Sequence, residues 1–252
     1  MVIGIMAGLL GGMFGVGGGL IIVPALASVA KMDRRRASGT SLAATLPIAA
    51  AALVTYVANS NVDWAVALCL AIGAIGGAVV GTHLLSVIPK NVLTIIFVIT
   101  VLATAARLGI GTETTGRADL SITMVIMLIL VGLFTGTLAG LLGIGGGVIM
   151  VPAMVVLFGM VPIVAKGTSV AVIIPTSIMG TFRNRQNANV DLRVATIVGG
   201  FGAISAIAGG LIASDLSDRT SNVMFALLLL VVAATQVATL RKPKQTARAS
   251  GT

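Results

Sequence analysis

The feature that most limits the fold is a run of apolar residues, 64–87, that contains no Asp, Glu, Lys or Arg. A helix rises about 1.5 Å per residue, so this run is long enough to cross a hydrocarbon core about 30 Å thick. Charged residues make up only 9% of the chain, whereas a soluble domain carries about 25%. We therefore expect an all-α integral membrane protein with several transmembrane spans.

The net charge of +9 does not indicate a nucleic-acid partner, because the Lys and Arg residues lie in loops between the apolar spans. The lone cysteine, Cys69, cannot form an internal disulfide or a CxxC redox pair. The sequence contains no recognisable metal-ligand cluster, Ser/His/Asp arrangement or paired-carboxylate site. We expect neither an enzyme nor a cofactor or metal ion, and the lipid bilayer is the expected surrounding.

An internal repeat with an offset of 128 organises the chain. Residues 8–26 match residues 136–154, with identical residues at 11 of 19 positions. The same offset aligns residues 39–41 with 167–169, Pro47 with Pro175, and the Asn-x-Asn-Val-Asp segment at 59–63 with residues 187–191. Apolar composition alone does not place prolines, asparagines and an aspartate in register. We predict a first repeat over 1–112, a second over 113–240 and a basic tail over 241–252.

The distribution of basic residues predicts that the two repeats are inverted. The first repeat has Lys31, Arg34, Arg35 and Arg36 before Gly39, where the second has only Lys166. The next loop reverses this bias, since residues 59–63 lack Lys and Arg while the matching region contains Arg183, Arg185 and Arg193. Because cytoplasmic loops are enriched in Lys and Arg, equivalent loops are expected on opposite faces. Residues 31–38, residues 183–193 and the C-terminal tail are then cytoplasmic.

Inversion requires an odd number of crossings per repeat. Residues 38–58, 64–87 and 91–110 supply three crossings, and residues 119–158 are expected to form a hairpin that turns at its glycine-rich centre. This predicts about eight full spans, or up to ten helical elements when each arm of a glycine-broken hairpin is counted. The first arm of the first repeat is expected to be short, because residues 121–128 have no counterpart at the N-terminus.

Two glycine-rich breaks are the strongest candidates for a substrate site. A non-helical backbone at membrane depth must face protein or a water-filled cavity, and the exposed amides of a following helix start favour an anion. The alternative is close helix packing through small residues. The candidate substrate-binding glycines are Gly17, Gly18, Gly19, Gly145, Gly146 and Gly147.

Further polar and proline residues recur in both repeats. The hydroxyls of Thr40, Ser41, Thr168 and Ser169 are expected to open the next helices, and they either bind the substrate or cap those helices. Pro24, Pro47, Pro152 and Pro175 are candidate hinges, because proline removes a helix hydrogen bond. The asparagines and aspartates of the 59–63 and 187–191 segments are expected to form turns and caps. Lys166 and Arg183 are either fixed cations near a pore or snorkelling interfacial residues.

All seven carboxylates fall in or beside loops, and this absence from the spans favours an anion over a cation as substrate. The paired GxGGG-xxxx-P segments, Gly15, Gly17, Gly18, Gly19 and Pro24 with Gly143, Gly145, Gly146, Gly147 and Pro152, resemble those of the TauE/SafE family of sulfite and organosulfonate exporters. The resemblance covers nearly the whole chain. It implies a small sulfur-containing or carboxylated anion as substrate and a location in the prokaryotic cytoplasmic membrane.

Two alternatives to an anion carrier remain open at this point. The first is an anion channel with glycine carbonyls along a continuous pore, and the second is a membrane accessory subunit without transport of its own. The sequence leaves open the identity of the substrate, the direction of transport and the coupling ion. It also leaves open whether the chain forms a homo-oligomer.

Overall fold

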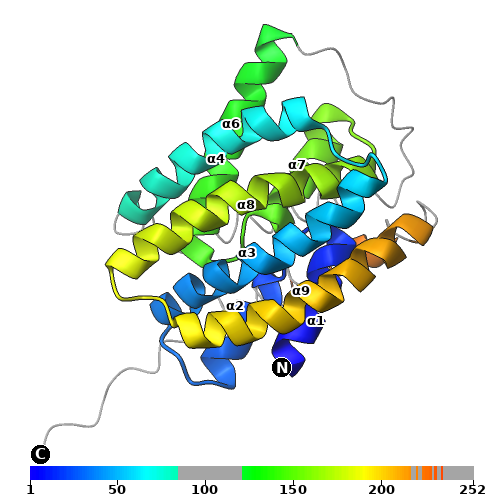
Figure 1. The fold of residues 1–252 in the computed structure, drawn as a ribbon. Coiled ribbons are helices and arrows are strands. Elements are labelled where there is room, and N and C mark those ends of the chain that lie inside the picture. Colours follow the sequence, from blue (N-terminus) through cyan, green and yellow to red (C-terminus); the bar gives the residue numbers. More distant parts are fainter. Residues whose placement is uncertain (85–120, 217–219, 221–222, 229, 232–233, 235–252) are drawn as a thin grey trace, which may run out of the picture.

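The structure, a computed structural model, describes residues 1–84, 121–216, 220, 223–228, 230–231 and 234. Every regular element of at least ten residues in these ranges is a helix (Figure 1). The helices are α1 (Val2–Phe14), α2 (Gly19–Ser28), α3 (Arg34–Ala58), α4 (Trp64–Leu84), α6 (Ile122–Leu142), α7 (Gly147–Phe158), α8 (Pro162–Gln186) and α9 (Leu192–Asp215). The predicted span over 91–110, the boundary between the repeats and the basic tail lie outside the described residues.

The sequence repeat corresponds to a structural repeat. Helices α3 and α8 each contain 25 residues, and both of their ends are separated by the offset of 128. Both predicted hairpins are present, as α1–α2 and α6–α7. The short first arm is confirmed, because α1 has 13 residues and α6 has 21.

The equivalent helices run in opposite directions, which confirms the inverted arrangement. Near the start of α3, Gly39 packs against Asn184 and Asn189, at the end of α8 and in the loop that follows. Near the start of α8, Gly167 packs against Tyr56 and Asn61, at the end of α3 and in its following loop. Figure 1 shows the same opposition for α4 and α9. The basic residues at the start of α3 therefore lie at the same end of the molecule as those at the end of α8, as expected.

The two repeats interlock through their first helices. Helix α1 packs along α9 of the second repeat, and α6 packs along α4 of the first. In both helix pairs, glycines at four-residue spacing allow the two helix backbones to approach closely. A Cβ added to Gly8 would collide with the Gly202 carbonyl, and one added to Gly136 would collide with the Ala74 carbonyl. Neither hairpin therefore packs within its own repeat alone.

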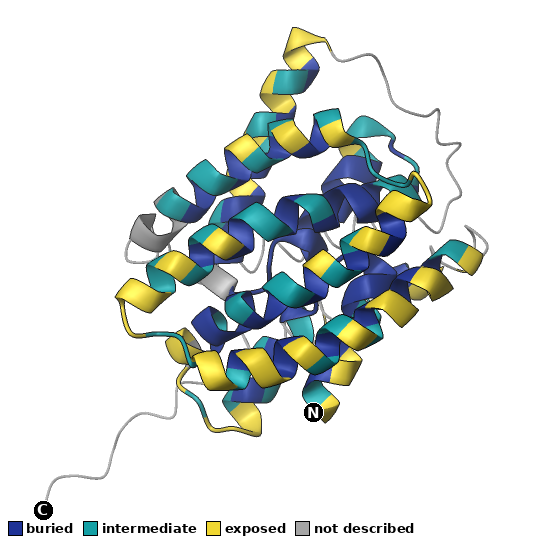
Figure 2. Ribbon diagram, in the orientation of Figure 1, coloured by how far each residue is buried: buried dark blue, intermediate teal, exposed yellow. Residues whose placement is uncertain are grey.

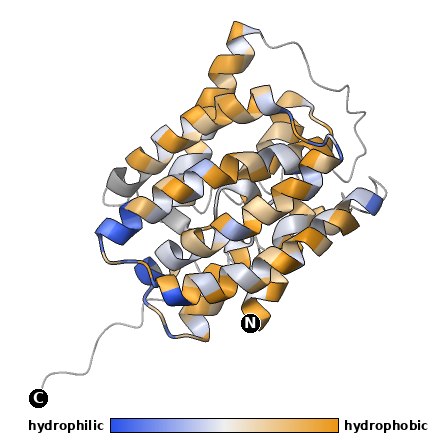
Figure 3. Ribbon diagram, viewed as in Figure 1, coloured by the Kyte–Doolittle hydropathy of each residue, from blue (hydrophilic) through white to orange (hydrophobic). Residues whose placement is uncertain are grey.

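The outer surface suits a lipid environment. Large apolar side chains such as Val54, Leu68 and Ile204 are 64–73% exposed, and in a bilayer such side chains contact acyl chains. Figure 2 shows buried residues concentrated in the interior, on α3, α7 and α8. Hydrophilic residues gather at helix ends, most clearly where α8 ends and α9 begins (Figure 3). By length and composition, four helices in the described part of the chain can span a membrane: α3, α6, α8 and α9.

Candidate substrate site at the two glycine breaks

Each hairpin is interrupted by three glycines in the left-handed region. The φ angles are +69°, +73° and +77° at Gly15, Gly17 and Gly18, and between +68° and +79° at the equivalent residues of the second repeat. Glycine adopts this conformation without the steric cost that a Cβ introduces. The Gly-x-Gly-Gly pattern therefore dictates both breaks. In each, the third of these glycines is the N-cap of the helix that follows.

The two breaks are in direct contact. A Cβ built on Gly19, the first residue of α2, would lie 2.7 Å from the carbonyl of Ile144 in the other break. A Cβ built on Gly147, the first residue of α7, would lie 2.6 Å from the Gly15 carbonyl oxygen. Each helix start thus packs against the opposite break, and only glycine permits this approach. The structure brings together the two sets of glycines that the sequence marked as candidates.

Six amides at this junction have no hydrogen-bond acceptor in the part of the chain that the structure describes. For the N–H groups of Gly17, Gly18, Gly19 and their three counterparts, the described residues provide no hydrogen-bond acceptor. These glycines are nevertheless buried. A buried, unsatisfied amide is costly, and two helix starts facing each other repel through their positive dipole ends. An anion at the junction would relieve both penalties.

Ser41 and Ser169 hold the breaks in place. The Ser41 hydroxyl donates a hydrogen bond of 2.9 Å to the Gly143 carbonyl, and the Ser169 hydroxyl donates one of 3.0 Å to the Gly15 carbonyl. Both side chains are fully buried, and each bond joins one repeat to the other. Whether these hydroxyls also contact the substrate stays a prediction.

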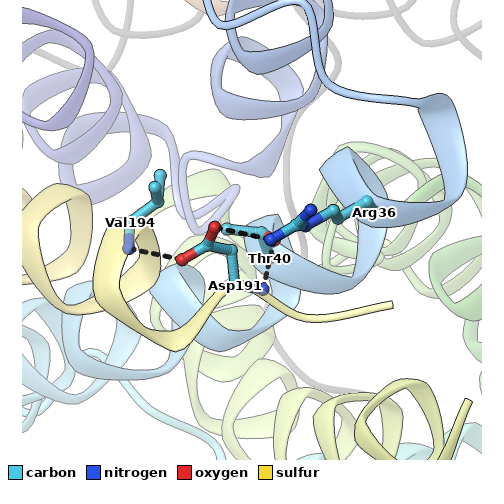
Figure 4. A network of polar contacts seen from close by, with 4 residues as sticks. All are labelled: Arg36, Thr40, Asp191 and Val194. Atoms are coloured by element: carbon cyan, nitrogen blue, oxygen red, sulfur yellow. Dashed lines mark hydrogen bonds and ion pairs between the residues drawn. The ribbon is translucent and has the colours of Figure 1, made fainter. Parts of the chain in front are cut away.

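Thr40 and Thr168 make a second pair of equivalent contacts. The Thr40 hydroxyl accepts a hydrogen bond of 2.9 Å from the Asp191 amide, and the Thr168 hydroxyl accepts one of 3.0 Å from the Asp63 amide. Figure 4 shows the first of these contacts beside the Arg36–Asp191 ion pair of 2.9 Å. The Asp63 and Asp191 carboxylates accept from amides at the starts of α4 and α9, which confirms their predicted capping role. A substrate role for the two threonines stays a prediction.

The prediction that these Gly-Thr-Ser segments open their helices is wrong. Helix α3 begins at Arg34, because Asp33 accepts a hydrogen bond from the Arg35 amide and acts as the N-cap. Helix α8 begins at Pro162, and proline suits the first turn of a helix because its missing N–H would be unpaired there. The segments therefore lie within the second turn, where their side chains reach the other repeat.

The four candidate hinge prolines lie inside helices that continue past them, Pro24 in α2, Pro47 in α3, Pro152 in α7 and Pro175 in α8. Each removes one backbone hydrogen bond and frees the carbonyl four residues earlier. A hinge role for these prolines stays a prediction.

Lys166 does not lie in a loop, as the topology prediction assumed, and it does not snorkel. It is in the second turn of α8 with a relative exposure of 0%. Its ammonium lies 5.7 Å from the centre of the Phe14 ring and 5.5 Å from that of Phe225. The misassignment arose because Pro162 starts the helix earlier than the basic-residue pattern suggested. Arg183, by contrast, lies in the last turn of α8, at the predicted end of the molecule.

Sequence reasoning missed Thr45. Its Cγ2 would lie 2.8 Å from a Cβ on Gly17 and 3.3 Å from one on Gly145, so it touches both breaks. Its hydroxyl is fully buried and has no hydrogen-bond partner among the described residues. The equivalent residue in the second repeat is Ile173, so the repeat comparison offered no signal for a polar residue here. The methyl group of Thr45 is the part that contacts the two breaks, and its buried hydroxyl is a further polar group close to the junction.

Comparison with known proteins gives the family. Residues 1–108 and 128–252 match the family described as "Sulfite exporter TauE/SafE". The chain belongs to the TauE/SafE family. It is 28% identical over 220 residues to the "Probable membrane transporter protein YunE" of Bacillus subtilis, covering 76% of this chain and 79% of the relative. It is 29% identical over 243 residues to a "Probable membrane transporter protein" of Xylella fastidiosa, covering 92% and 89%.

The protein is accordingly a multi-pass membrane transporter of the TauE/SafE family rather than an enzyme. The resemblance noted from the paired glycine motifs is confirmed. No solved structure matches the chain.

Proposed function

We propose that this TauE/SafE protein is a secondary transporter of a small anion, such as sulfite, an organosulfonate or a related sulfur or carboxyl oxyanion. The observation that carries the proposal is the meeting of two buried helix starts whose amides have no acceptor among the described residues. Amides at a helix start bind anions. Thr45, whose methyl group lies against both breaks, also has a buried hydroxyl without a hydrogen-bond partner among the described residues. The substrate would bind there, with Thr40, Ser41, Thr168 and Ser169 supporting the site.

Alternating access follows from the inverted repeat. In transporters of this construction, one repeat bundle rocks against the other around a site near the membrane midplane. Here the contacts that would rearrange are those between the opposing breaks, with the prolines of α2, α3, α7 and α8 as the hinges. The family and the positive-inside pattern support the prokaryotic cytoplasmic membrane as the location, with residues 31–38 and the C-terminus in the cytoplasm.

The test is anion flux into proteoliposomes that contain Gly18→Val or Gly146→Val. Both residues have φ near +78° and a buried backbone, so a β-branched side chain would distort the N-cap amides. Gly200→Val is the matched control, because nothing lies within 4 Å of a Cβ at this exposed position of α9. We expect loss of flux in both break variants, with normal insertion and monodispersity, and unchanged flux in the control. Retained flux in both break variants would remove this site.

The same reconstitution separates the rival functions. A channel would give unitary currents in planar bilayers, whereas a carrier turns over too slowly to do so. An accessory subunit would transport none of sulfite, thiosulfate, taurine, sulfoacetate and simple carboxylates, and it would retain a partner in pull-down experiments.

A further inference from the structure

Lys166 is the one charged residue that is fully buried in the described part of the chain. Placing an ammonium in a membrane protein interior is expensive, and such residues commonly mark ion or substrate pathways. The Phe14 and Phe225 rings, stacked with centroids 5.6 Å apart, both lie within cation–π distance of its Nζ. The ammonium is thus in contact with aromatic residues from two separate parts of the sequence.

The position of Lys166 relates it directly to the first glycine break. A Cβ built on Gly15 would lie 2.6 Å from the Lys166 carbonyl oxygen and 2.8 Å from its Cβ. The ring of Phe14, which the ammonium faces, belongs to the last residue of α1, immediately before that break. The next two hydroxyl residues of α8 are Thr168 and Ser169, and Ser169 donates to the Gly15 carbonyl. The backbone and Cβ of Lys166 therefore lie against the first break, and its ammonium lies over the ring of the residue that immediately precedes this break.

The equivalent position in the first repeat lacks this charge. Ser38 occupies it and makes the same backbone contact, since a Cβ on Gly143 would lie 2.5 Å from the Ser38 Cα. The fold repeats this contact closely, but only one copy carries an ammonium. Local packing against a break glycine consequently does not require lysine. The comparison of Ser38 with Lys166 therefore shows that the contact with the break glycine and the positive charge of Lys166 are independent features.

We propose that Lys166 is the fixed positive charge of the anion site and makes the transporter favour divalent over monovalent oxyanions. The proposal rests on the anion-transport function proposed above. The Coulomb energy between the ammonium and the substrate is proportional to the substrate charge. A dianion such as sulfoacetate therefore gains about twice the free energy that a monoanion such as methanesulfonate gains.

The size of the effect follows from Coulomb's law. For an assumed separation of about 8 Å and an effective dielectric constant of about 20, one charge pair accounts for about a thirtyfold difference in affinity. Removal of the charge should then raise the KM for methanesulfonate by about thirtyfold. The KM for sulfoacetate should rise by a factor that approaches the square of this value. A purely structural role of Lys166 would reduce flux of both substrates by a common factor.

The experiment measures proteoliposome flux of both substrates for wild type, Lys166→Ser, Lys166→Arg and Lys31→Gln. Serine is chosen because Ser38 shows that it fits the equivalent contact, and Lys31 is an exposed lysine that serves as the control. We expect Lys166→Ser to lose the preference for the dianion, with Lys166→Arg retaining it and the control unchanged. Ser38→Lys in the wild-type background is the reverse test, because it adds a lysine at the equivalent position. It should increase the preference for the dianion over the monoanion.

The outcomes distinguish the two proposals. If wild-type protein moves neither anion, the proposed function fails and the role of Lys166 fails with it. If wild-type protein moves both but the ratio of KM values is the same in Lys166→Ser, the role of Lys166 is overturned while anion transport stands. If Lys166→Ser does not fold, an unchanged ratio in Ser38→Lys overturns it.

Discussion

Replacing Gly147 by alanine tests the contact between the two breaks with the smallest change the chain allows. Gly147 is the first residue of α7 and its φ is not positive, so alanine introduces no backbone strain there. Its Cβ would lie 2.6 Å from the Gly15 carbonyl oxygen and 2.8 Å from the Val16 Cα. An ordinary contact begins near 3.4 Å, so the first break must retreat by about 0.8 Å.

The effect of Gly147→Ala on the free energy of unfolding can be estimated from two opposing contributions. Alanine in place of glycine in a helix stabilises by up to about 1 kcal/mol, whereas overpacking a tight contact costs about 1–3 kcal/mol. The clash at Gly147 involves backbone atoms that cannot rotate away, so the cost should be near the upper end. We expect a net destabilisation of about 1–2 kcal/mol and at least a tenfold loss of anion flux, because the amides of both helix starts move.

The assay pairs thermal unfolding in detergent with proteoliposome flux per monodisperse protein. Gly200→Ala is the control, because it is also a helical glycine but nothing lies within 4 Å of its Cβ position. It should keep normal flux and have an equal or higher melting temperature. Wild-type flux and stability in Gly147→Ala would refute the close contact between the breaks, and with it the geometry of the site.

Two further predictions test the arrangement around the site. The first uses a protein in which Cys69 is replaced by serine and a single cysteine is introduced as Ser60→Cys or Ala188→Cys. These two exposed residues are equivalent in the inverted repeats, so a membrane-impermeant maleimide should label them from opposite sides of the membrane. Labelling of both from the same side would contradict the inversion. Ser41→Ala should lower the free energy of unfolding by about 1–2 kcal/mol, since it removes a buried hydrogen bond between the repeats; unchanged unfolding would show that this bond is unimportant.

The sequence predicted the parts of the fold that depend on local backbone preference. Glycines at equivalent positions, such as Gly18 and Gly146, specify left-handed backbone, and asparagine and aspartate in both repeats specify turns and caps. The exchange of basic residues between equivalent loops predicted the inversion, because it reports which face each loop occupies. These signals act within a few residues and are therefore visible without a structure.

The parts that sequence reasoning missed depend on contacts between distant segments. Thr45 is a single hydroxyl in an apolar run, and only the packing of α3 across both breaks makes it a candidate. The burial of Lys166 was missed as well, because the aromatic rings that its ammonium contacts come from residues 14 and 225. Neither arrangement has a local pattern, and in both cases the other repeat has a different residue, Ile173 or Ser38.

We propose that an anion binds between the two helix starts at the glycine breaks. The most direct measurement is an experimental structure of the protein with selenite, whose selenium atom can be located by anomalous scattering as a substitute for the sulfur of sulfite. We expect a selenium peak at the junction, with oxygens within hydrogen-bond distance of amides from both breaks. A selenium peak elsewhere in the protein, with the junction closed and empty, would contradict it.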